Sequence, residues 1–388
     1  MDELQAVREL FAKPAPPRPQ VITSARARLK GPTPPRRRIW LRAAVPAVAV
    51  AAAASVATAI AVQAPQTGPG IHQNGPGASP AARSILLAAA RTVADTPAPA
   101  AGRYWQTMNV IANIITVGPA GRHYLIVEKV AAQQWTARKA PGQTYSLSQA
   151  LAVQPASPRD RAAWRHDGSP TTWNIDQEDS LADPHGYTSG FGRNITAGRG
   201  KLMGMSVFAT GTGKTFAFGH TLLSARELQA LPASPARLKA LILHESTAGA
   251  DWYVFQVAPS LLTMPVTPAV RAALYRMLAG LPGVQSQGQV KDPAGQPGAA
   301  VALTGRFRHC GGYGQQVPAG DRTGYRFSSC TVQQRLIIDM HTGLPLAQEL
   351  RYLKLPAGQT WSAPGGLFSY QLFRSARWTN AAPPHPSN

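Results

Sequence analysis

The stretch Leu346-Ala347-Gln348-Glu349-Leu350-Arg351-Tyr352 decides the fold, because its residues alternate between two faces. Leu346, Gln348, Leu350 and Tyr352 would lie on one face, and the residues between them on the other. Residues 368–372 repeat the pattern. A period of two is typical of a strand with one buried face, and consecutive strands joined by short turns pair antiparallel. The sequence therefore predicts an antiparallel sheet near the C-terminus.

Further hairpins are predicted outward from this stretch. Residues 336–346 read as a hairpin in which Asp339 and Gly343 supply the turn chemistry. Residues 103–117 and 122–136 read as a long hairpin that turns at 118–121. Residues 252–257, rich in aromatic and β-branched side chains, also favour a strand.

Three helices are expected to begin with a hydroxyl residue followed by proline, at Ser79-Pro80, Ser234-Pro235 and Thr267-Pro268. Strands in runs with a few helices between them indicate an α+β fold. We expect a curved antiparallel sheet whose concave face packs toward the helices at 234–246 and 267–280.

An uncharged run at residues 43–62 follows a basic cluster and has the length of a membrane-crossing helix. The predicted organisation is a cytoplasmic tail (1–38), a transmembrane helix (39–62), a Pro/Gly-rich linker (63–80), an extracytoplasmic half-barrel-like domain (81–380) and a disordered C-terminus (381–388). The basic excess before the run predicts a single-pass cell-membrane protein with its N-terminus in the cytoplasm. A cleaved signal peptide is the alternative.

The chain of 388 residues has a formal net charge of +21. This excess suits anionic lipid headgroups or wall polymers. The charge is scattered, without a stripe of interleaved basic and aromatic residues, so no nucleic-acid partner is predicted.

Cys310 and Cys330 are the two cysteines. An even pair outside the cytoplasm favours a disulfide. The bridge would close a loop of roughly 20 residues and add about 3 kcal/mol in the chain-entropy model. A metal site with His309 and His341 is the alternative, but the spacing matches no zinc module, so no metal or cofactor is predicted.

Several short motifs resemble catalytic or binding signatures but lack a required residue. Residues 211–215 end like a phosphate-binding loop, yet Phe208 stands where its first glycine belongs. His244-Glu245 lacks a second histidine four positions after the first. The acidic segment from His166 to Asp183 matches no calcium loop. No catalytic residue is therefore predicted, and the chain is expected not to be an enzyme.

The opening Met1-Asp2-Glu3-Leu4, the block 267–295 and the block 338–346 resemble a family of actinobacterial single-span membrane proteins of unknown function. The outer portion more loosely resembles the half-barrels of periplasmic lipoprotein carriers and of sigma-factor regulators. That resemblance implies a curved sheet that cups a lipid against helices.

The predicted function is a membrane-anchored extracytoplasmic sensor or regulator, anti-sigma-like, which binds a lipid, an envelope component or a protein. Its tail would contact a cytoplasmic partner such as a sigma factor, and its span would lie in the bilayer. A carrier module without signalling and an extracytoplasmic enzyme are the alternatives. Trp252, Tyr352 and Phe368 are the candidate wall of an apolar cleft, with filled core as the competing interpretation.

Overall fold

The structure is a computed structural model. It describes residues 77–119, 122–139, 142–175, 193–196, 202–210, 213–218, 221–244, 251–307, 315–319, 322–326, 330–355 and 365–384. Every statement below concerns these residues.

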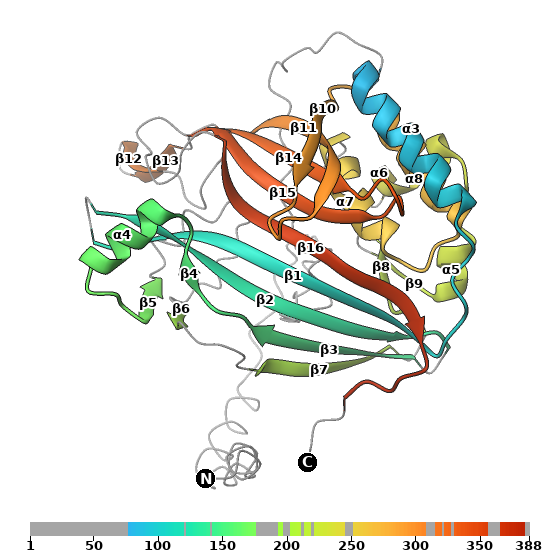
Figure 1. Cartoon of the computed structure of the whole chain (residues 1–388), viewed down its shortest axis with the longest axis horizontal. Coiled ribbons are helices and arrows are strands. Elements are labelled where there is room, and N and C mark those ends of the chain that lie inside the picture. Colours follow the sequence, from blue (N-terminus) through green and yellow to red (C-terminus); the bar gives the residue numbers. More distant parts are fainter. Residues whose placement is uncertain are drawn as a thin grey trace, which may run out of the picture. The chain divides into compact units, whose positions relative to one another are not determined.

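A ten-stranded sheet forms the framework (Figure 1). Its order is β10-β11-β14-β15-β16-β1-β2-β3-β7, with β4 also paired to β2, and all of these pairs are antiparallel. The strands are β1 (Tyr104–Val117), β2 (Tyr124–Ala137), β3 (Gly142–Ala150), β4 (Gln154–Pro155), β7 (Leu202–Thr210), β10 (Gln285–Lys291), β11 (Pro297–Phe307), β14 (Cys330–Ile338), β15 (Pro345–Lys354) and β16 (Gly366–Thr379).

Three two-stranded sheets lie apart from this framework. They are β5 (Thr172–Ile175) with β6 (Arg193–Thr196), β8 (Phe216–Phe218) with β9 (Thr221–Leu223), and β12 (Gln315–Ala319) with β13 (Arg322–Arg326).

The helices are α3 (Pro80–Asp95), α4 (Pro158–His166), α5 (Ala225–Gln229), α6 (Pro235–His244), α7 (Asp251–Leu262) and α8 (Pro268–Ala279). Helix α3 packs on β10 and β11, and α7 packs on β11, β14 and β15. Helix α8 packs against α3, α6 and α7, and Figure 1 shows α3 and α8 side by side. Ser79 and Thr267 cap α3 and α8 with their side chains, as the sequence predicted.

The two faces of the large sheet have different surroundings. On the helix side, Trp105 donates its indole N–H to the carbonyl of Thr263 at 3.0 Å, and Gln348 donates its amide to the carbonyl of Gln256 at 3.1 Å. Glu349, the next residue along β15, points to the other face because successive strand side chains alternate. The main core lies between the sheet and the helices.

The turn between β14 and β15 confirms the predicted hairpin. Asp339 accepts hydrogen bonds from the backbone N–H of His341 and the hydroxyl of Thr342. Gly343 has a φ of 68°, which favours glycine. From α8, the buried hydroxyl of Tyr275 donates to the carbonyl of Gly343 at 2.6 Å. The predicted hairpin of β1 and β2 is also confirmed.

The predicted fold class was wrong. The molecule is built mainly of antiparallel sheet, and within the described part no helix is long and apolar enough to cross a membrane. The reason lies in the share of each element type: β1, β2 and β16, with 14 residues each, belong to a ten-stranded sheet, whereas the helices, of 5 to 16 residues, pack on the sheets or on each other. The segment 39–62, for which a transmembrane helix was predicted, lies outside the described residues.

The predicted strand at 252–257 is instead part of helix α7. Nine of its twelve residues are buried, so the helix is surrounded by other elements. A helix that is apolar all round carries no amphipathic period, which explains why its aromatic and β-branched residues favoured a strand. Helices α3 and α7 take the place on the sheet that was expected for the helices at 234–246 and 267–280.

Candidate functional site

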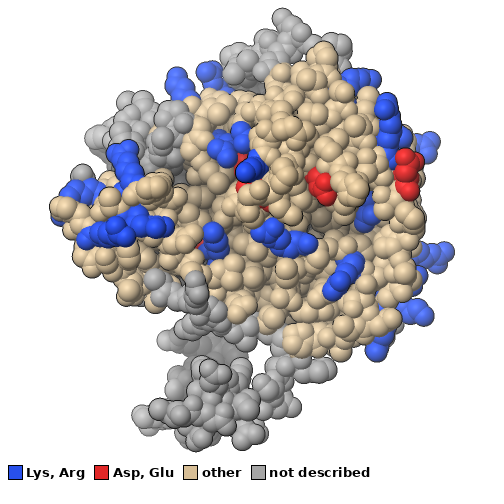
Figure 2. Space-filling view, in the orientation of Figure 1, with Lys and Arg blue, Asp and Glu red and all other residues tan. Residues whose placement is uncertain are grey.

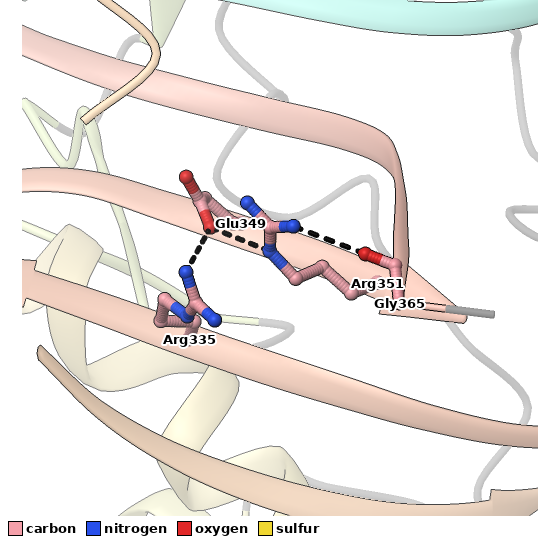
Figure 3. A network of polar contacts seen from close by, with 4 residues as sticks. All are labelled: Arg335, Glu349, Arg351 and Gly365. Carbon is pink, nitrogen blue, oxygen red and sulfur yellow. Dashed lines mark hydrogen bonds and ion pairs between the residues drawn. The ribbon is translucent and has the colours of Figure 1, made fainter. Parts of the chain in front are cut away.

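Two arginines share one carboxylate (Figure 3). Glu349 lies on the sheet face opposite α7, because its neighbour Gln348 bonds to α7 and strand side chains alternate. Arg335 lies on β14, directly across from Glu349 on β15, and Arg351 lies two residues further along β15. Arg351 donates its Nε–H to Glu349 Oε2 at 2.9 Å, and Arg335 Nη1 lies 3.4 Å from the same oxygen. Arg351 Nη1 also donates to the carbonyl of Gly365 at 3.0 Å. The three side chains therefore form a single network.

The network is buried to different depths. The Glu349 side chain is 1% exposed, whereas Arg335 and Arg351 keep 17% and 24% of their surface in contact with solvent. The buried Arg335 Nε has no hydrogen-bond partner among the described residues. One carboxylate thus faces two cations, and one donor of the Arg335 guanidinium is left unused.

The pKa of Arg335 agrees with the presence of two cations and one carboxylate in the network. Burial lowers the pKa of Arg335, the positive charge of Arg351 lowers it further, and the carboxylate of Glu349 raises it. The two guanidiniums therefore lie close enough to repel each other, and Glu349 compensates for only one of them. The network carries an excess positive charge.

Tyr370 on β16 is the cross-strand partner of Glu349. Burial raises the pKa of its hydroxyl; Arg374 lowers that pKa, and Asp292 and Glu349 raise it. Asp292 is 4% exposed, and its Oδ2 has no hydrogen-bond partner within the described part of the chain. A neutral phenol thus stands next to Glu349.

This arrangement is suited to holding an anionic group. Guanidiniums bind carboxylates and phosphates through paired N–H donors, and these bonds are stronger in a partly desolvated place than in water. The side chains of Arg351 and Arg335 are 24% and 17% exposed and provide such donors, whereas the Nε of Arg335 is buried. One face of the molecule, shown in Figure 2, carries several Lys and Arg side chains and few Asp or Glu, so an anion meets a positive field around the molecule.

The three residues predicted for an apolar cleft are all buried in the core. Trp252 of α7, Tyr352 of β15 and Phe368 of β16 are 6%, 0% and 7% exposed and belong to one hydrophobic cluster. The rings of Tyr352 and Phe368 lie 4.4 Å apart between centroids. Their burial agrees with the competing interpretation, in which these side chains are filled core.

Cys330 begins β14 and is 2% exposed. The described residues contain no free cysteine. Cys310, the predicted partner, lies outside the described residues, so the pairing stays a prediction.

Residues of the motifs that lacked a required residue make structural contacts in the described part of the chain. Asp167, next to His166, accepts a hydrogen bond from the buried Tyr124 at 3.0 Å, which ties α4 to β2. Lys214 forms an ion pair with Glu227 at 2.9 Å. In the described part of the chain, no group of three His, Cys, Asp or Glu side chains could hold a metal ion.

The alternation in the sequence placed Glu349 and Arg351 on one face of a strand but predicted no functional role for them. The available signal was a Glu and an Arg two positions apart on one strand, which places both side chains on one face. Arg335 could not be added without the register of β14 against β15. Comparison of the chain with protein-family models, with curated proteins and with solved structures finds no match, so the functional argument rests on this geometry.

Proposed function

We propose that this chain is a binding protein of the sensor or regulatory class, and that its ligand or partner presents an anionic group to Arg335 and Arg351. The observation that carries the proposal is the single buried carboxylate oxygen shared by two guanidiniums. An anion that approaches this pair would find donors in place and would pay little to order them.

The surroundings of the pair support binding over catalysis. The phenol of Tyr370 has a raised pKa, so it offers a neutral hydroxyl and not a base at physiological pH. The loose resemblance to half-barrel carriers and sigma-factor regulators points to the same class of function. The alternative of a lipid carrier draws no support from the aromatic trio, because those rings pack in the core.

The test uses the purified full chain and two small anions, citrate and inorganic phosphate. We expect citrate to raise the melting temperature of the wild-type protein in a saturable way, as any ligand that binds only the folded state does. The variant Arg351→Gln should lose most of this response, and Arg351→Lys, which keeps the charge without the planar fork, should lose part of it.

The matched control is Arg276→Gln, which removes the same charge from an exposed position on α8. This control is needed because phosphate and similar anions stabilise many proteins by exclusion from the surface. A citrate response that is the same in Arg351→Gln, Arg276→Gln and the wild type would refute the proposal.

A further inference from the structure

A second basic surface lies at one end of the sheet, and we call it the strand-end patch. It consists of Arg103 before β1, Arg138 and Lys139 after β2, and Arg377 near the end of β16, with the rings of Tyr104 and Trp378. All four cations are exposed. Lys and Arg side chains gather at the edge of the molecule where β16 ends (Figures 1 and 2).

The register places the members of the strand-end patch at one end of the sheet, on both of its faces. Trp378 of β16 pairs with Trp105 of β1 on the helix side, and the neighbouring Arg377 pairs with Gln106 on the other side. The backbone N–H of Arg138 donates to the carbonyl of Arg103 at 2.9 Å, so the ends of β1 and β2 lie side by side. None of the four cations forms an ion pair with another described residue.

Two of the guanidiniums are held over aromatic rings. Arg138 lies 5.6 Å from the centroid of the Trp378 ring, and Arg103 lies 5.8 Å from that of Tyr104. Trp378 also meets Trp105 edge-on at 5.2 Å. A guanidinium in such a position is restrained while its N–H edge stays available to an anion.

We propose that the strand-end patch is a docking surface for an acidic polysaccharide, a linear polymer of sugars that repeats carboxylate groups. Neighbouring strands lie about 4.8 Å apart, so cations on three adjacent strands spread over roughly 10–15 Å. This spread suits a series of charges along a polymer better than one small ion. Polar groups such as Gln106 and Thr379 lie among the cations and can bind sugar hydroxyls.

Two other polyanions fit the strand-end patch less well. Single-stranded nucleic acid binds by stacking its bases on open aromatic rings, but here arginines lie over Tyr104 and Trp378. A surface that enters a membrane needs exposed apolar side chains. Among the exposed large apolar residues of the described part, Met108 lies on β1 two residues from Gln106, and the others belong to other elements: Val207, Leu222, Leu241 and Leu353.

The test measures binding of the full chain to immobilised polygalacturonate. The double variant Arg138→Gln/Arg377→Gln should bind about tenfold more weakly than the wild type, with a shallower dependence on NaCl, because two exposed cationic contacts are lost. The matched control Arg83→Gln/Arg91→Gln removes two exposed charges from α3 and should bind like the wild type.

Several outcomes would overturn the proposal. They are no binding of polygalacturonate by the wild type, an equal loss in the double variant and the control, or tighter binding to phosphatidylglycerol vesicles or oligothymidylate that the same variant abolishes. The double variant leaves Arg335 and Arg351 in place. Its response to citrate should therefore be unchanged, which separates this test from that of the arginine pair.

Discussion

The substitution Glu349→Gln tests the arginine network most directly, because it removes the shared carboxylate while keeping the shape of the side chain. Two contacts to Oε2, at 2.9 Å and 3.4 Å, lose their charge. Breaking a fully buried ion pair costs about 3–5 kcal/mol, and breaking an exposed one costs about 0–1 kcal/mol. Because Glu349 is 1% exposed but both arginines keep contact with solvent, we expect a loss of about 2–3 kcal/mol.

Urea unfolding followed by tryptophan fluorescence measures this loss as a lower midpoint at an unchanged slope. The control is Asp251→Asn, which breaks the more exposed pair between Lys239 and Asp251, where the two side chains are 34% and 31% exposed. The control should lose at most about 1 kcal/mol.

A second measurement, the stabilisation of the Glu349→Gln variant by citrate, separates an anion-binding role of the network from a structural one. With Glu349 neutral, Arg335 and Arg351 repel each other without compensation, so an added anion has more to gain. Citrate at about a hundred times its dissociation constant would return about 2.7 kcal/mol to the variant. A loss below about 0.5 kcal/mol would refute the reasoning about burial. Equal stabilisation of the variant and the wild type by citrate would refute the binding role.

Three further predictions concern other parts of the chain. Tyr275→Phe removes the buried hydrogen bond to Gly343 and should lower the free energy of unfolding by about 1–2 kcal/mol in urea titrations. Hydrogen bonds from the Ser224 backbone, and then the Lys214 partner, lower the pKa of Glu227 to about 2, so its contribution is present above the unfolded value of 4.5 and is lost as pH falls toward 2. In the variant Glu227→Gln, the urea midpoint should depend less on pH between 4.5 and about 2 than it does in the wild type. A midpoint that depends on pH as in the wild type would contradict this. If Cys310 and Cys330 are bridged, thiol titration of the denatured, unreduced protein should find no free thiol, and reduction should cost about 3 kcal/mol.

Much of the framework could be predicted because its signals are local. The hydroxyl–proline pairs mark where α3 and α8 begin, and the alternation of residues 346–352 marks β15. Helix α7 could not be recognised in this way, since the burial of Trp252 and Phe255 comes from neighbouring elements that are distant in sequence. Tertiary packing there overrides the local preference for strand.

The arginine network could not be predicted because it depends on a bulge. Counting back from the pair Ile338 and Pro345 with a regular register would place Arg335 opposite Gln348. The irregularity between Ile337 and Ile338 shifts the register by one residue and places Arg335 opposite Glu349. Such a bulge carries no clear mark in the sequence.

The core on one face of β15 therefore determines the site on the other. A slip of β15 by one residue would turn both Glu349 and Arg351 toward α7 and would leave Gln348 on the face of Arg335, since the side chains of a strand alternate. Gln348 is held on the helix side by its bond to the carbonyl of Gln256. The turn that follows β14 is held by Tyr275 through Gly343, whose Cα region lies against Val93 of α3 so closely that an added Cβ would come within 2.6 Å of that side chain. These contacts on the helix side fix the register of β14 against β15. As a consequence, the guanidiniums of Arg335 and Arg351 meet one buried oxygen of Glu349 on the opposite face.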